Sequence, residues 1–291
     1  MAMAETATPA GDLDPGGFVR KLTLELALGD VRLPSFPDIA ARVQHVLEDT
    51  RAAPAQVAQV VGSDAALAAR VLRLANSAFL NPSARQITDL QQAVTRLGHQ
   101  LVRCTAVSFA LQQMKLGAGE AELRPQLKEL WRKGTLVASI AYVLARETQA
   151  ATPDEALVTG LMHNIGRLYI TVNAPRAATA ANHEAWAAVV NDWHPKIASS
   201  ILKHWKFPPA IIAAVEDQNA WDREVYGDEG LTDVLIAATT LVPCVFYREL
   251  LSETVTAVPP FERLGLKAED CQRLLAATAA QIKSLHSALA G

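Results

Sequence analysis

The sequence predicts an all-α protein, and three observations favour this fold class. Half of the 291 residues are hydrophobic but only 5% are aromatic, and alanine and leucine, which favour helices, are abundant. Apolar residues recur at helical spacing along most of the chain, and no clear alternating strand pattern recurs. Capping residues and prolines stand where these periodic stretches begin. We therefore expect many helices around a large core.

The first half of the chain is typical of a series of amphipathic helices. Pro37 suits a helix start, where its missing N–H does no harm. Either Ser63 or Asp64 can cap a later helix, and "TDLQ", residues 88–91, has the form of a capping box. Gly98 can close that helix in the left-handed conformation. The predicted helices are 18–28, one starting at Pro37, 54–61, one following Asp64, 88–98 and 101–114.

The second half follows a predicted linker, "LGAGEAE", residues 116–122, where two glycines interrupt the periodicity. "TPDE", residues 152–155, is another capping box, and it opens a helix that is apolar around most of its surface. Gly160 and Gly166 cost helix propensity, but they allow neighbouring helices to approach closely. The predicted helices are 124–147, 153–172, 179–191, 195–204, 208–217, 231–250 and 268–289.

Composition and charge exclude several classes of function. The net charge of −3 does not favour binding to nucleic acid, and no apolar run approaches the roughly 20 residues that span a bilayer. The start of the chain does not resemble a signal peptide, and residues 1–17 read as a disordered tail. Cys104, Cys244 and Cys271 lie far apart and indicate reduced thiols in a cytoplasm. No GxSxG, P-loop or HExxH motif occurs.

Two stretches of the sequence carry an ordered set of motifs. The first contains "LPSFP", then "LRLANSAF" with Asn76 and Ser77, then a step from Ala93 to Gly98. The second contains "LWRKGTLVAS", "MHNIG" and "WHPKIASSIL". Together they cover about residues 30–220 and resemble the HDOD family, bacterial signalling relatives of HD-domain metal phosphohydrolases.

The resemblance implies an HDOD fold, in which an N-terminal helical subdomain packs on a degenerate HD-like helical subdomain. It also implies where the parts of this chain begin and end. We expect a tail at 1–17, an N-terminal helical part at 18–115, an HD-like part at 123–225 and a C-terminal helical extension at 226–291.

The resemblance further implies where HD-type metal ligands would fall, and most of those positions are changed. Two histidines and two aspartates suit phosphate ester hydrolysis, because they hold divalent metals that activate water. The first histidine is replaced by a lysine, the paired aspartate by an asparagine, and the closing aspartate by a threonine. Two further histidine positions hold a glutamine and an asparagine. The candidates for a vestigial pocket are Lys133, His163, Asn164, His194, Gln218 and Thr239, and Asn219 stands at the other changed histidine position.

No carboxylate survives at these matched positions, so we expect no catalysis, no metal and no cofactor. The expected function is non-catalytic regulation through protein partners of a bacterial signalling pathway. The resemblance links such proteins to cyclic-di-GMP or two-component signalling. The alternative is a divergent HD-type phosphohydrolase that acts on a nucleotide or phosphodiester, with His163 and His194 joined by acids such as Asp192, Glu216 or Asp217.

Other hypotheses concern single residues. Lys133 in the histidine position, with Arg132 and Arg167, could turn the pocket into a site for a small anion. His163 could instead be a core histidine bonded to Asn164 or Thr239. Asn76 and Ser77 have a structural reading as helix-terminating residues, with partner binding as the alternative.

Overall fold

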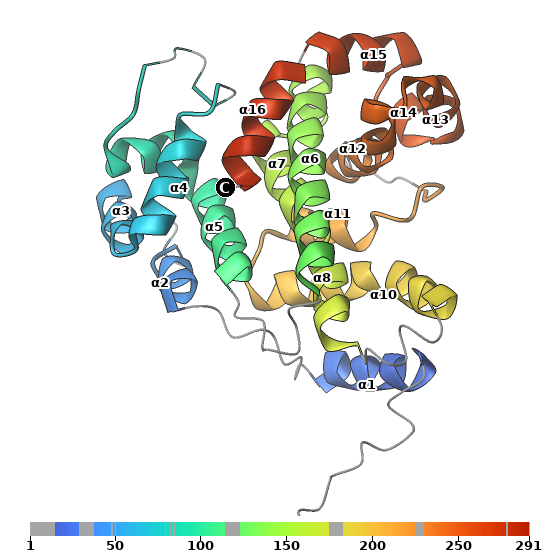
Figure 1. Cartoon of the computed structure of the whole chain (residues 1–291), viewed down its shortest axis with the longest axis horizontal. Helices are drawn as coiled ribbons and strands as arrows, with labels where there is room; N and C mark the ends of the chain where they lie inside the picture. Colours follow the sequence, from blue (N-terminus) through green and yellow to red (C-terminus); the bar gives the residue numbers. More distant parts are fainter. Residues whose placement is uncertain are drawn as a thin grey trace, which may run out of the picture.

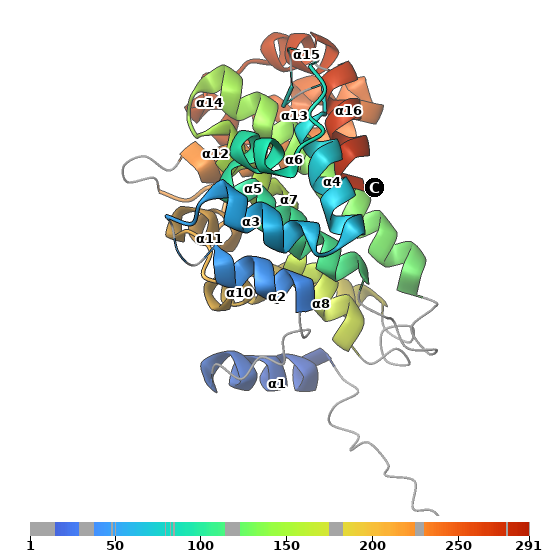
Figure 2. The same cartoon turned by 90° about the vertical axis from the view of Figure 1, so that its left-hand side faces the viewer.

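Helices form every regular element in the part of the chain that the computed structural model describes. These residues are 15–28, 38–47, 49, 51–78, 80–81, 83, 85–113, 123–174, 183–224, 230–277 and 279–290. The all-α prediction is confirmed, and an N-terminal helical subdomain packs on a second helical subdomain (Figures 1 and 2). The predicted linker at 116–122 and most of the predicted tail lie outside the described residues.

The N-terminal subdomain is a group of helices that pack on one another. They are α2 (Asp38–Val46), α3 (Pro54–Gly62), α4 (Ala65–Ala75) and α5 (Leu90–Gln113). Asp64 caps α4, because its carboxylate accepts the backbone N–H groups of Ala66 and Leu67, each at 2.9 Å. One detail of the sequence prediction is wrong here, because Asp89 rather than Thr88 receives the Gln92 N–H, at 2.8 Å. Gly98, at φ 70° and with non-helical geometry, separates two helical segments of α5 at a kink, close to where the sequence predicted one helix to close.

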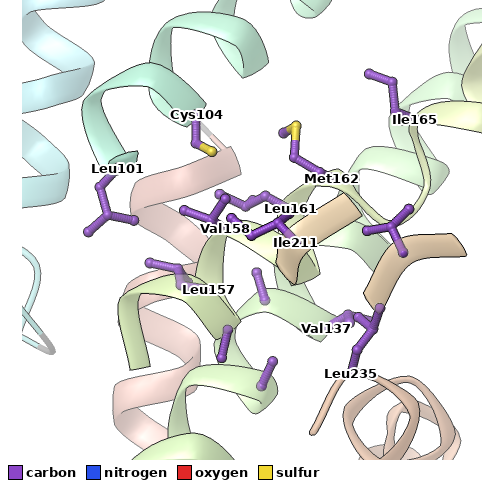
Figure 3. Packing of buried hydrophobic residues seen from close by; sticks show 14 of the residues in the cluster. Leu101, Cys104, Val137, Leu157, Val158, Leu161, Met162, Ile165, Ile211 and Leu235 are labelled. Atoms are coloured by element: carbon purple, nitrogen blue, oxygen red, sulfur yellow. The ribbon is translucent and has the colours of Figure 1, made fainter. Parts of the chain in front are cut away.

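The second subdomain surrounds a central, buried helix. It comprises α6 (Arg124–Thr148), α7 (Pro153–Met162), α8 (Ile165–Asn173), α10 (His183–His204), α11 (Pro209–Glu216) and α12 (Gly230–Phe246). Thr152 caps α7, with its hydroxyl accepting the Glu155 N–H. Every residue from Ala156 to Met162 is buried. Figure 3 shows side chains of α7 meeting residues of α5, α6, α8, α11 and α12 in one core.

A glycine brings α6 and α7 into close contact. A Cβ atom on Gly160 would lie 2.4 Å from the Cα atom of Ala138, so only glycine fits without displacing α6. Gly134 lies in the same helix pair, but a Cβ atom there would lie 3.8 Å from the Leu161 carbonyl oxygen, an ordinary contact. The predicted role of Gly160 in close packing is confirmed.

Two predicted helix boundaries are wrong in the second subdomain. The predicted helix 153–172 is broken at His163 and Asn164 into α7 and α8. The predicted helices 179–191 and 195–204 form one helix, α10, with Pro195 inside it. Proline lacks the N–H that would bond the carbonyl four residues earlier, so the helix needs another donor for that oxygen.

The C-terminal helices cover the top of the second subdomain (Figure 1). They are η3 (Arg248–Leu250), α13 (Leu251–Ala257), α14 (Pro260–Arg263), α15 (Ala268–Ala277) and α16 (Ala279–Ala290). The predicted helix 231–250 ends at Phe246, and α13 and α14 were not predicted. The buried Asp233 holds α12 to this region, because it pairs with Arg223 at 2.7 Å and Arg263 at 2.8 Å.

Contacts between distant parts of the chain join the two subdomains. Arg103 of α5 donates to the Lys206 carbonyl after α10, at 3.1 Å, which crosses between the subdomains. It also donates to the Leu47 carbonyl after α2, at 2.8 Å, within the N-terminal subdomain. Its guanidinium also lies 5.9 Å from the centre of the Phe207 ring. The first helix, α1 (Pro15–Leu28), packs on α10 through Phe18. None of the helices described here is long and apolar enough to cross a membrane.

Candidate functional site

The site is built around the break between α7 and α8. His163 is the C-cap residue of α7, and Asn164, at φ −93° and ψ 3°, precedes α8. Gly166, the second residue of α8, lies directly against α10, because a Cβ atom there would lie 1.9 Å from the His194 carbonyl oxygen. The break therefore lets α8 lie on α10 and brings two histidines from different helices together.

Both imidazoles are buried, and burial keeps them neutral. His163 is 3% exposed and His194 is 1% exposed. Desolvation lowers the pKa of His163 to about 4; the Gly160 hydrogen bond opposes this in part, and Arg167 adds a smaller lowering. Desolvation lowers the pKa of His194 to about 2, and Arg167 and His163 add to that effect. Protonating either ring would place a second cation beside Arg167.

The hydrogen bonds of the two rings differ. His163 Nδ1 lies 2.6 Å from the Gly160 carbonyl oxygen, which requires a proton on Nδ1 and leaves Nε2 as the unprotonated atom of the neutral ring. The expected hydrogen bond from His163 to Asn164 or Thr239 is wrong, because His163 Nδ1 bonds the Gly160 carbonyl instead. Neither ring nitrogen of His194 has a hydrogen-bond partner among the described residues.

Arg167 is the cation of the site. Its guanidinium donates to the Asn191 side-chain oxygen at 2.9 Å, and burial lowers its pKa. No carboxylate pairs with it in the described part of the chain. The site thus contains two neutral imidazoles and one guanidinium bonded to a neutral amide.

Gln218 and Asn219, at the positions of two lost histidines, bond the backbone. Gln218 Nε2 donates to the carbonyls of Val215 at 2.7 Å and His163 at 3.2 Å. Asn219 Nδ2 donates to the Asn191 carbonyl at 3.0 Å. That carbonyl is the one left without a helical donor by Pro195, four residues later. The two amides therefore satisfy backbone groups at the end of α7 and inside α10.

Lys133 and Thr239 do not join the histidines. The Lys133 side chain is 54% exposed and lies 3.9 Å from Glu129 of its own helix. Thr239 is exposed, and its hydroxyl donates to the Leu235 carbonyl of its own helix at 2.8 Å. Arg132 also pairs with Glu129, through two hydrogen bonds of 2.8 Å. Arg132 and Lys133 therefore pair with Glu129 of their own helix, and Arg167 bonds Asn191 of α10. Among the described residues, the structure shows no contact that brings these three cations together.

The donor set does not fit a divalent metal that would activate water. Such a site needs three or four protein ligands, and a hard divalent ion prefers carboxylates. Across the described residues, no three or more His, Cys, Asp or Glu side chains form a group able to hold a metal ion. The alternative acids lie elsewhere: Asp192 is exposed, and Glu216 bonds Ser199 and Lys203. Arg167 beside both imidazoles would also repel a cation.

Asn76 and Ser77 lie at the end of α4. Asn76 is its C-cap residue, at φ −94° rather than in the left-handed region. Its side chain donates to the Leu72 and Ile87 carbonyls and accepts the Ile87 N–H at 2.7 Å. Ser77 is 5% exposed. Asn76 therefore joins the end of α4 to the segment before α5.

Asn191 was missed by the sequence prediction. It occupies a central place, since its side chain accepts from Arg167 and its carbonyl accepts from Asn219. The signal was its spacing: it precedes His194 by three residues on a helix, so the two share one face.

Comparison with known proteins supports the fold. The model of the HDOD domain family matches residues 33–221. No curated protein matches the chain.

Several solved structures have a similar fold at low sequence identity. A protein of Shewanella amazonensis SB2B, named provisionally as a metal-dependent phosphohydrolase, has a TM-score of 0.71 at 24% identity, over 94% of this chain and 99% of its own. An HDOD domain protein with unknown function from Geobacter sulfurreducens has a TM-score of 0.61 at 22% identity, over 92% and 98%. A protein of Marinobacter aquaeolei VT8, named provisionally as a signal transduction protein, has a TM-score of 0.59 at 22% identity, over 99% and 69%.

Proposed function

The chain belongs to the HDOD domain family, and from that membership we propose that it is a non-catalytic regulatory protein of a bacterial signalling pathway. It acts in the cytoplasm by binding a protein partner. Cyclic-di-GMP or two-component signalling is the pathway class that the family resemblance suggests. The similarity in fold to a protein named provisionally for signal transduction supports this class.

One observation carries the proposal: the two amides at positions matched to HD-type histidines donate hydrogen bonds to backbone carbonyls. Gln218 bonds the His163 and Val215 carbonyls, and Asn219 bonds the carbonyl that Pro195 leaves without a donor. The Gln218 bonds are buried, and a buried carbonyl without a donor costs about 1–3 kcal/mol, whereas the Asn219 bond is exposed. These residues therefore contribute stability where a hydrolase would place metal ligands.

The experiment separates this proposal from a divergent phosphohydrolase. Metal content of the purified full chain is measured, and phosphodiester and nucleotide substrates are assayed with added manganese or iron. We expect less than stoichiometric metal and no turnover. Stoichiometric metal together with turnover that is lost in His163→Ala would establish the enzyme instead. A pull-down from the source cell then identifies the partner.

A small anionic ligand is a second candidate, and Arg167 favours it. This partly buried guanidinium has only the neutral Asn191 amide as its hydrogen-bond partner among the described residues. A phosphate oxygen could take up the remaining donors of the guanidinium. Calorimetric titration with cyclic dinucleotides tests this binding: heat that disappears in Arg167→Gln supports it, and no heat with the wild type excludes those ligands.

We also propose the division of the chain into an N-terminal part at 18–115, an HD-like part at 123–225 and a C-terminal extension at 226–291. Packing of α2 to α4 on α5 supports the first boundary. Limited proteolysis of the full chain should cut first between residues 115 and 123. A first cut inside α6 or α7 would contradict this division.

A further inference from the structure

A cavity lies away from the histidine site, where α6 and α12 meet the C-terminal helices, whose arrangement Figure 1 shows. Its volume is about 400 Å³, within the range of roughly 300–1,000 Å³ that is usual for small-molecule sites. Most of the wall is apolar, and it is formed by Leu136, Val245, Leu251, Leu275 and Ile282. These side chains come from five helices, α6, α12, α13, α15 and α16.

The polar residues at this cavity are mainly cations. Arg132, Arg248 and Lys283 line it, and no acidic residue does so in the part of the chain described. Glu129 already pairs with Arg132. Arg248 and Lys283 are both exposed, and neither forms an ion pair with a described residue. Two positive charges at the rim are therefore available to an anion.

Exposed apolar side chains extend the cavity toward solvent. Phe246 lines it and is 58% exposed, and the adjoining Tyr247 and Leu250 are 59% and 39% exposed. Three large apolar side chains so close in sequence and so accessible form an apolar approach to the cavity. The side chain of Phe246 also lies beneath Arg132, with the guanidinium 5.9 Å from the ring centre.

We propose that this cavity binds a small amphiphilic anion. Its apolar body, an acyl chain or an aromatic ring, fills the space among Leu136, Leu251 and Ile282. Its carboxylate or phosphate head pairs with Arg248 and Lys283 at the rim. The cavity is too small and too apolar for an extended charged ligand. No acidic residue among those lining it could pair with its cations. This ligand site is independent of the partner-binding function proposed above.

The test is calorimetric titration of the full chain with hexanoate, octanoate, octyl phosphate and octanol. Octanoate should bind more tightly than hexanoate, by about fourfold for each added methylene. Octanol should bind at least about tenfold more weakly than octanoate, because it lacks the charge-assisted contacts. Comparing octanoate with octyl phosphate assigns the head group. Bound ligand should also raise the melting temperature.

Variants of residues that line the cavity test whether the ligand binds there. The double variant Arg248→Gln/Lys283→Gln should weaken octanoate binding by at least about tenfold and leave octanol unchanged. Ala279→Trp places a large side chain at an exposed position of the cavity wall and should weaken the binding of both. The matched control is Arg20→Gln/Lys21→Gln, which removes two exposed charges of α1, at the opposite end of the molecule (Figures 1 and 2).

Three outcomes overturn the proposal. The first is no heat with either anion, and the second is equal binding of octanoate and octanol. The third is octanoate binding that the Arg248→Gln/Lys283→Gln variant leaves unchanged. Circular dichroism melting of each variant shows whether the fold is retained, so a loss of binding in a folded variant counts for the proposal.

Discussion

At the scale of single residues, the electrostatics of His163 and His194 follow from where they lie. Both are buried beside Arg167, so a proton on either ring would lose hydration and meet a like charge. The pKa of each ring is therefore below the value of 6.5 for an unperturbed histidine. Neutral imidazoles at physiological pH contribute packing to the core and no charge.

This arrangement predicts how stability depends on pH. The folded-state pKa values, about 4 for His163 and about 2 for His194, lie below the unfolded value of 6.5. Below pH 6.5 the unfolded chain binds more protons, so the stability is complete above that pH and is lost as pH falls. Each ring should lower the free energy of unfolding by about 2 kcal/mol between pH 7 and pH 5. Urea denaturation at pH 7, 6 and 5 measures this loss.

A variant isolates the contribution of one ring. His194→Leu removes a side chain whose nitrogens have no hydrogen-bond partner in the described residues, so its stability at pH 7 should change little. Its loss of stability between pH 7 and pH 5 should be about 2 kcal/mol smaller than that of the wild type. His204→Leu, at an exposed position of the same helix, is the control. Equal losses in all three proteins would contradict the prediction.

The family resemblance indicated which residues occupy the matched ligand positions, but not where all of their side chains lie in the fold. Lys133 matched a ligand position of the family, yet it lies four residues after Glu129, and that spacing places both on one solvent-facing side of a helix. Thr239 satisfies its hydroxyl within its own helix. Which face of a helix meets the core depends on neighbouring helices, and a motif match alone carries no such information.

At the scale of elements, the caps at Asp64 and Thr152 were predicted better than the breaks and continuities inside helices. Asp64 and Thr152 cap helices through contacts within three residues, which a local sequence pattern contains. The continuity of α10 across Pro195 depends on Asn219, 24 residues further along the chain, so no local pattern could show it. The break at His163 likewise depends on contacts between α8 and α10.

The contact between α6 and α7 predicts opposite changes in stability when two glycines are replaced by alanine. Gly160→Ala would place a Cβ atom 2.4 Å from the Ala138 Cα atom, so it should destabilise the protein by about 1–3 kcal/mol. Gly134→Ala has room for its Cβ and should stabilise the protein by about 0.5–1 kcal/mol through helix propensity. Urea denaturation of both variants measures the difference. Equal effects would show that α6 and α7 can separate at little cost.

At the scale of the whole molecule, Arg103 of α5 joins the two subdomains by one hydrogen bond and holds α2 to α5 by another. It bonds the carbonyls that follow α2 and α10, which are separated from it by 56 and 103 residues. The family resemblance predicted that the subdomains pack together. The residues that join them could not be predicted, since their pairing connects distant segments.

This contact predicts a large effect of one substitution. Arg103→Met keeps much of the apolar stem but leaves the Leu47 and Lys206 carbonyls without this donor, so it should cost about 2–4 kcal/mol. Arg96→Met on the same helix is the control. Its donor to the Leu80 carbonyl is exposed, so the loss should stay below about 1 kcal/mol. Thermal denaturation of the two variants compares them, and similar melting temperatures would refute the role of Arg103.

The last helix of the chain has a consequence for biosynthesis. α16 packs on both α6 and α4, and the Ser284 hydroxyl accepts the Ala78 N–H across 206 residues of sequence. Domains fold as the ribosome releases them, N-terminal part first. The surfaces of α4 and α6 that α16 covers stay open until α16 has left the ribosome. A ribosome stalled before residue 279 would therefore hold a nascent chain with those apolar surfaces exposed, which is the state that chaperones recognise.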